Sequence, residues 1–228
     1  MTHNKEVKLL FPTPLFRMSI ADRSIVGNIK SSLLSLRDKD GMVGKTNITC
    51  ASNNYLVSNY WQTKDDLYDH PEFSQLSKII ELEFTEILEY LSVNCDGFYI
   101  NNMWGNISYP LHTHHYHIHP NSYYSGLLYV SSPKGCSTTV FQDTRQNSMS
   151  MFEPAYFEHN DVNSSVCISD PDEGNLIFWP SWMAHSVMTP DVDQETILEM
   201  KDKERMTIAF TIMLIGKNEK HTRKIKWK

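Results

Sequence analysis

The hydrophobic positions in the first 96 residues recur mainly with the period of an α-helix. One apolar stripe is formed by Ile25, Ile29, Leu33 and Leu36. This spacing predicts a helix that Asp22 or Ser24 can cap. A longer helix is predicted over 70–91, with its apolar face made by Phe73, Leu76, Ile80, Phe84, Ile87, Leu88 and Leu91. Both helices are expected to pack against a sheet.

Two other segments of this half lack a helical period. Positions 7–20 are rich in β-branched and aromatic residues around Pro12 and Pro14. Proline cannot donate into a central ladder, so an edge strand is predicted here. Positions 40–70 are polar and aromatic without a clear period, which is typical of a long ordered loop.

After Gly97 the pattern changes to short β-rich runs separated by Pro, Gly, Asn and Asp. Strands are predicted near 98–106, 116–119, 125–131, 137–142, 150–157, 174–179, 183–188 and 205–215. Helices followed by strands do not alternate as a parallel α/β sheet requires. The expected class is a β-rich α+β fold, a jelly-roll or cupin-like barrel buttressed by N-terminal helices.

Length and composition favour one domain over 1–228. It would consist of an N-terminal strand with supporting helices (1–96), a jelly-roll core (97–215) and a basic tail (216–228). Apolar residues make up 40% of the chain and charged residues 21%, which is ordinary for a globular protein. Cys50, Cys95, Cys136 and Cys167 are scattered and are expected to be free thiols.

The net charge is −6, although the tail is basic. An acidic body argues against a nucleic-acid groove, because phosphate binding needs clustered Lys and Arg. The tail is either a solvated terminus or a docking arm for an acidic partner. The first residues do not resemble a signal peptide, and no apolar run is long enough to span a membrane. A soluble, cytoplasmic protein is expected.

The segment 111–120, LHTHHYHIHP, contains five of the ten histidines. On a strand, residues i and i+2 face the same side, so His117 and His119 can ligate one metal ion. The other three are expected to be surface residues or to lie behind the ligands; they are His112, His114 and His115.

His185 lies in an apolar context within FWPSWMAHSV. Alone it would be read as a satisfied core histidine, but paired with the upstream H-x-H it becomes a candidate third ligand. Three imidazoles suit iron, zinc, copper or nickel, so the ligands do not choose the metal.

Arg205 begins an otherwise apolar strand, RMTIAFTIMLI. A guanidinium inside a barrel needs an anion, and a carboxylate could bind it in bidentate fashion. Thr207 shares its face and could add a hydroxyl. The alternative is an exposed Arg205 beside Glu204 at the start of the strand.

At these residues the chain resembles a family of 2-oxoglutarate- and Fe(II)-dependent oxygenases from marine bacteria and their viruses. The similar blocks occur in order over most of the chain: LFPTPLF, HIHPNSYYSGLLYV, VFQDTR, FWPSWMAHSV and ERMTIAF. The resemblance implies a double-stranded β-helix. It also implies Fe(II) bound by His117 and His185, with 2-oxoglutarate held by Arg205 and Thr207.

The sequence departs from the wider superfamily at His119, where a carboxylate is usual. Either His119 is the third ligand, or water fills that place, or Asp143 replaces it. Ser125 and Tyr129 alternate with Leu127 on one predicted strand and are expected to contact the cosubstrate.

The resemblance implies a hydroxylase that couples oxidative decarboxylation of 2-oxoglutarate to C–H oxidation. Two rivals remain open: a cupin-like metalloenzyme that does not use 2-oxoglutarate, and a non-catalytic jelly-roll binding module. The substrate, a small molecule or a peptide, is not identified, and neither is the oligomeric state. The cell compartment would be the host cytoplasm if the chain is phage-encoded. The stretch 191–204 is either a lid or a solvated loop.

Overall fold

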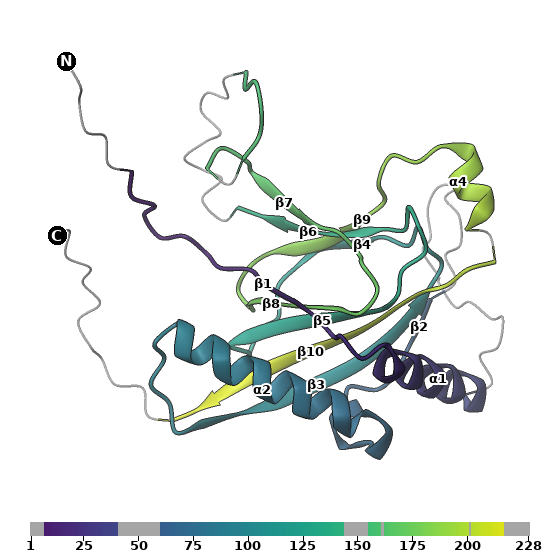
Figure 1. Ribbon diagram of the computed structural model, residues 1–228, viewed down its shortest axis with the longest axis horizontal. Helices are drawn as coiled ribbons and strands as arrows, with labels where there is room; N and C mark the ends of the chain where they lie inside the picture. The colour runs from purple at the N-terminus through teal and green to yellow at the C-terminus, as the bar shows by residue number, and fades with distance from the viewer. Residues whose placement is uncertain (1–6, 41–59, 144–154, 161, 201, 217–228) are drawn as a thin grey trace.

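The computed structural model describes residues 7–40, 60–143, 155–160, 162–200 and 202–216 (Figure 1). In this part of the chain the strands form two antiparallel sheets. The six-stranded sheet has the order β1 (Phe16–Ser19), β8 (Asn175–Pro180), β5 (Tyr124–Ser131), β10 (Arg205–Ile215), β3 (Gly97–Ser108) and β2 (Tyr60–Gln62). The four-stranded sheet has the order β4 (His114–His117), β9 (His185–Met188), β6 (Thr138–Gln142) and β7 (Val166–Ser169).

Two long helices, α1 (Arg23–Lys39) and α2 (Ser74–Tyr90), cover one face of the six-stranded sheet, and the smaller sheet lies over the other (Figure 1). The predicted cap is confirmed, because the Asp22 carboxylate accepts a hydrogen bond from the Ser24 amide at 2.9 Å. Two 3₁₀ turns, Leu67–Asp69 and Pro71–Phe73, precede α2. The helices therefore leave the opposite face of the large sheet for the site.

Strand β10 lies at the centre of the large sheet and divides its side chains between the two faces. The apolar set packs into the main core with the helices and consists of Met206, Ile208, Phe210 and Ile212. The alternate residues Arg205, Thr207 and Ala209 line a cavity on the other side. The period of two in the sequence thus separates core from cavity.

Glycine at 126 is required by close packing within the large sheet. A Cβ atom built there would lie 2.1 Å from the Phe210 ring and 2.8 Å from the Ile177 carbonyl oxygen. Neither the buried ring nor the backbone oxygen can move freely. Gly126 is therefore a packing requirement of the sheet.

Most predicted elements are confirmed to within a few residues, including both helices. The edge strand predicted over 7–20 is confirmed in type but is limited to Phe16–Ser19. The predicted strand at 150–157 is not present at 155–157, and its remainder lies outside the described residues. Strand β7 was not predicted. Of the loop predicted over 40–70, residues 41–59 lie outside the described residues, while β2 is a strand that pairs with β3.

The segment 191–204 contains a short helix, α4 (Gln194–Glu199), which Asp193 caps. Met200, directly after it, is 1% exposed, so the segment is anchored to the body of the protein. Cys95 and Cys136 are free thiols as predicted, whereas Cys50 and the tail residues 217–228 lie outside the described residues. Among the helices that the structure describes, none has the length and apolarity needed to cross a bilayer.

We expect Gly126→Ala to lower the free energy of unfolding by about 1–3 kcal/mol, because the added methyl group overpacks the sheet. Urea unfolding followed by circular dichroism measures this change. The matched control is Gly27→Ala in α1, where an added Cβ meets no atom within 4 Å. That variant should be more stable by about 0.5–1 kcal/mol, because alanine favours helix. Equal stabilities of the two variants would contradict the packing argument.

Candidate metal centre

One cavity of about 290 Å³ lies between the two sheets and receives side chains from both. His117, His119 and His185 line it together with Arg205 and Thr207. Five of the seven residues that the sequence singled out as metal or cosubstrate contacts therefore meet in one place. The other two, Ser125 and Tyr129, do not line the cavity.

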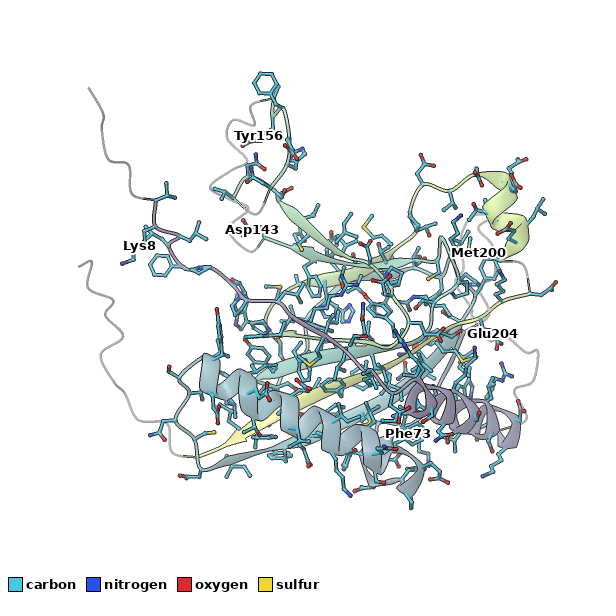
Figure 2. All side chains as sticks on the ribbon, in the orientation of Figure 1. Lys8, Phe73, Asp143, Tyr156, Met200 and Glu204 are labelled. Carbon is cyan, nitrogen blue, oxygen red and sulfur yellow. The ribbon has the colours of Figure 1, made fainter. Side chains whose placement is uncertain are left out.

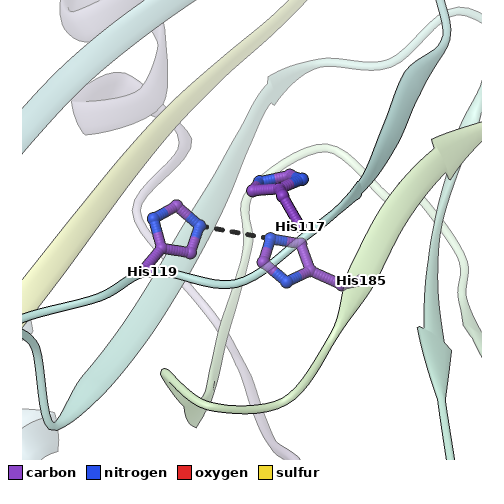
Figure 3. A group of neighbouring side chains, drawn as sticks. All are labelled: His117, His119 and His185. Atoms are coloured by element: carbon purple, nitrogen blue, oxygen red, sulfur yellow. Dashed lines mark hydrogen bonds between the residues drawn. The ribbon is translucent and has the colours of Figure 1, made fainter.

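The two strands of the small sheet that carry histidines set the geometry of the cluster. His117 on β4 is the register partner of His185 on β9. His119 follows the end of β4, where its amide donates to the Ser181 carbonyl at 3.1 Å. The three imidazoles point toward one another (Figure 3), and one nitrogen from each lies within 4.8 Å of the others.

Backbone carbonyls lie beside Nδ1 of two of these rings. His185 Nδ1 lies 3.1 Å from the Met183 carbonyl oxygen, and His117 Nδ1 lies 2.9 Å from that of His115. A carbonyl can only accept, so Nδ1 of neutral His185 carries the proton and its Nε2 keeps the lone pair. His117 Nδ1 also lies 3.1 Å from His114 Nδ1, so the carbonyl of His115 favours the same tautomer there without being its sole contact. An outer hydrogen bond of this kind is typical of metal-binding histidines.

The third ring approaches the second closely. His119 Nε2 and His185 Nε2 are 3.2 Å apart, and the two rings are nearly parallel, with an interplanar angle of 12°. Because His185 Nε2 has no proton in the tautomer selected by Met183, it can accept from His119 or share a cation with it. The donor set fits a metal ion with nitrogen ligands.

Burial keeps the cluster neutral. Burial, followed by the positive charge that His117 would carry, lowers the pKa of His185 to about 3 and that of His119 to about 4. Burial also lowers the pKa of His117. Neutral imidazole is the form that binds metal ions, so protons do not compete for the site at neutral pH.

Arg205 is a buried cation without an ionic partner in the described part of the chain. Its side chain is 5% exposed. The Nε atom donates to the Ser137 carbonyl at 3.0 Å, whereas Nη2 has no hydrogen-bond partner there. The neighbouring Glu204 pairs with Arg37 instead. The alternative of an exposed Arg205 beside Glu204 is therefore wrong, and a buried donor remains for an anion in the cavity.

Ser125 and Tyr129 serve Arg205 and the cavity wall indirectly. The Ser125 hydroxyl is 2.8 Å from that of Ser181. The Tyr129 hydroxyl donates to Thr139 at 2.8 Å, and the Arg205 guanidinium carbon lies 5.7 Å from the centre of the Tyr129 ring. Both side chains are fully buried. Neither side chain is part of the cavity wall, and their contact with a cosubstrate stays a prediction.

Asp143, the alternative third ligand, follows β6 (Figure 2) and is not part of the histidine cluster or of the cavity wall. The amide of Asp143 donates to the Ser165 carbonyl at 2.9 Å. Its position gives no support to a ligand role.

The cavity also contains residues beyond the predicted contacts. His112 and His114, expected at the surface or behind the ligands, both line it. His114 is also exposed, and His112 stacks on Tyr60 with ring centres 4.8 Å apart. Burial, followed by His114, lowers the pKa of His112 to about 4. Trp104 also faces the cavity, with its ring centre 5.6 Å from that of His119. The alternation of β3 was the available indication for Trp104.

Comparison with known proteins identifies a family model that matches the region containing the site. Residues 102–211 match a family model described as "Putative 2OG-Fe(II) oxygenase". This region contains the three histidines, Arg205 and Thr207. No curated protein matches the chain.

Three solved structures show a similar β-rich fold. A prolyl-4-hydroxylase from Pseudomonas putida is 10% identical, with 90% of this chain and 94% of that chain covered and a TM-score of 0.51. HygX from Streptomyces hygroscopicus, crystallised with nickel and 2-oxoglutarate, is 10% identical, with coverages of 88% and 82% and a TM-score of 0.54. The carbocyclase SnoK from nogalamycin biosynthesis is 10% identical, with coverages of 89% and 80% and a TM-score of 0.58. HygX has also been crystallised with iron.

We expect the metal-free protein to lose stability as the pH falls from about 6.5 to about 4. A histidine in the unfolded chain gains its proton near pH 6.5, whereas His185, His119 and His112 resist protonation until about pH 3 to 4. The unfolded state therefore binds more protons in this window, and lower pH favours it. Urea midpoints measured with a chelator between pH 7 and 5 test this.

The control for this measurement is an exposed histidine. His185→Gln should make the pH dependence shallower, whereas His159→Gln, at an exposed position, should leave it unchanged. A midpoint that is constant from pH 7 to pH 5 would show that the cluster is not held neutral by burial.

Proposed function

We propose that this chain is an Fe(II)- and 2-oxoglutarate-dependent oxygenase of the hydroxylase type, built on a double-stranded β-helix. The observation that carries the proposal is the meeting of three neutral imidazoles and one unpaired guanidinium in a single cavity. The family match over 102–211 and the similar structures with iron or 2-oxoglutarate support the choice of metal and cosubstrate.

The histidines fit the metal. His117 and His185 have Nδ1 directed at backbone carbonyls, which leaves Nε2 of each for coordination. His119 occupies the position where a carboxylate is usual in the wider superfamily. We assign it as the third ligand, because its Nε2 lies beside that of His185.

Arg205 and Thr207 fit the distal carboxylate of 2-oxoglutarate. The free Nη2 of Arg205 supplies a charged donor, and Thr207 lies on the same face two residues later. Asn106 donates to the Thr207 hydroxyl oxygen at 3.4 Å, so that the hydroxyl proton remains available for a carboxylate. A dianionic cosubstrate would also compensate the buried charge of Arg205.

When bound, iron and 2-oxoglutarate supply the oxidising power, through oxidative decarboxylation by O₂ coupled to hydroxylation of a C–H bond. The contribution of the chain is to hold, orient and shield these groups. Leu127, Trp179 and Ala209 provide an apolar wall next to the polar residues. This wall limits water near the metal, which protects the oxidising step from side reactions.

We expect Fe(II) and 2-oxoglutarate, added anaerobically to the metal-free protein, to produce a weak visible charge-transfer band. In Arg205→Ala the cosubstrate should bind about thirtyfold more weakly, since removing one partner of a buried charge pair costs roughly 2 kcal/mol or more. Titration of the band with 2-oxoglutarate measures this affinity.

Arg17→Ala is the matched control, because Arg17 forms an exposed ion pair with Asp172 far from the cavity wall. It should leave the titration unchanged. Bound metal without any band would favour a cupin-like enzyme in which Arg205 binds the substrate itself. Absence of metal binding would favour a non-catalytic module.

The assignment of His119 is tested separately. We expect His119→Ala to weaken Fe(II) binding by more than about a hundredfold, beyond the effect typical of residues outside the coordination sphere. His119→Asp should retain the metal, because it restores a carboxylate ligand. Competition with a coloured chelator measures both affinities, with His185→Ala as the reference for lost binding. An unchanged affinity in His119→Ala would mean that water occupies the third position.

A further inference from the structure

One part of the cavity wall is formed by residues that the metal assignment does not use and of which only Asn106 enters the cosubstrate assignment. Tyr60 and Gln62 of β2 line it, together with Asp65 from the turn that follows and Trp104 and Asn106 of β3. We call these five residues the rim. The inference drawn from the rim rests on the proposed function in one respect, namely that a substrate bound at the rim would meet the metal.

The rim is continuous with the histidine cluster. Trp104 lies on β3 with its ring centre 5.6 Å from that of His119. Asn106, two residues further along the same face, accepts a hydrogen bond from the Tyr60 hydroxyl at 2.8 Å. Gln62 is the register partner of Asn106. A molecule resting on the rim would therefore extend toward the metal.

The turn that carries Asp65 is fixed to the sheet. The Met103 amide donates to the Asp65 carbonyl at 2.9 Å, and the Thr63 amide donates to the Gly105 carbonyl at 3.0 Å. Thr63 Oγ1 in turn accepts from the Gly105 amide at 3.0 Å. These bonds on both sides hold the Asp65 backbone beside Trp104.

The cavity wall has a positive charge at Arg205 and a negative charge at the rim. Among the described residues that line the cavity, Arg205 is the cation, and the proposed function assigns it to the distal carboxylate of 2-oxoglutarate. Asp65 is the carboxylate of the wall, and in the part of the chain that the structure describes no ion pair involves it. The Asp65 charge acts on the neighbouring Tyr60, whose pKa is raised to about 12, first by burial and second by this carboxylate. The rim is thus a negative, aromatic surface.

We propose that the rim binds a positively charged organic group, an amine or a guanidinium, and that the oxygenase substrate is cationic. The Asp65 carboxylate acts on Tyr60 and shares the cavity wall with the rings of Tyr60 and Trp104. Such a surface attracts a cation through charge and through the electron-rich ring faces. An anionic substrate such as a phosphate ester would be repelled by Asp65 and would compete with the cosubstrate for Arg205.

The test uses the metal-free protein and two probes of similar shape. N-acetyl-L-lysinamide is cationic, and N-acetyl-L-norleucinamide is uncharged. Calorimetric titration should show tighter binding of the lysine probe. The preference should fall about fivefold in Asp65→Asn, which is the size expected for one solvent-accessible charge pair. It should also fall with added salt.

Asp69→Asn is the matched control, because Asp69 carries the same charge a few residues away and does not line the cavity. It should leave the preference intact. Equal binding of the two probes to the wild-type protein, or an equal loss in both variants, overturns the proposal.

The two proposals fail in different ways. The titration of the probes needs neither iron nor 2-oxoglutarate, whereas the charge-transfer band needs both. A band without discrimination between the probes would refute the cationic rim and leave the oxygenase assignment. Discrimination between the probes without a charge-transfer band would refute the oxygenase assignment and leave the cationic rim.

Discussion

The antiparallel pairing of β10 with both β3 and β5 is the constraint on which the rest of the molecule depends. A strand in the centre of a sheet has no freedom to slip, because a shift of one residue would exchange its two faces. Met206, Ile208 and Phe210 would then enter the cavity, and Arg205 would enter the helix-facing core. The register thus fixes the core and the polar site together.

The electrostatics of the site depend on both sheets, because Arg205 comes from β10 and the imidazoles come from the smaller sheet and the segment that follows β4. The site contains a buried guanidinium but keeps its imidazoles uncharged, since burial opposes their protonation. The neutral imidazoles offer lone pairs to a metal ion, whereas Arg205, which has no ion pair among the described residues, attracts an anion. The cavity thus contains separate groups for a metal ion and for an anion.

Sequence reasoning predicted the parts of this arrangement that depend on unusual residue types in regular elements. His117, His119 and His185 stand out by density and context, and Arg205 stands out in an apolar strand. The face of Ser125 and Tyr129 was predicted as well, because Leu127 between them lines the cavity. The alternation along a strand predicts which face a side chain lies on. It does not predict that the Ser125 and Tyr129 hydroxyls are hydrogen-bonded to Ser181 and Thr139.

The residues that were missed depend on contacts between distant segments. Gln62 and Asp65 reach the cavity because a three-residue strand, β2, pairs with β3, and so short a strand has no detectable period. The stacking of His112 on Tyr60 cannot be read from local sequence either, so the prediction left open whether His112 lies at the surface or behind the ligands. Strand β7 was missed for a similar reason, since three of its four residues are exposed.

The pairing of β4 has a further consequence for local motion. This strand is at the edge of the small sheet and is held through β9, at His114 with Val187 and at His117 with His185. Such a short edge is expected to fray more readily than the centre of the large sheet. An ion shared by His117 and His185 would join the two strands at the point where they pair, so that fraying would require release of the ion. Hydrogen exchange of the β4 amides would then slow when a metal ion is bound, so that the exchange rate would report metal occupancy.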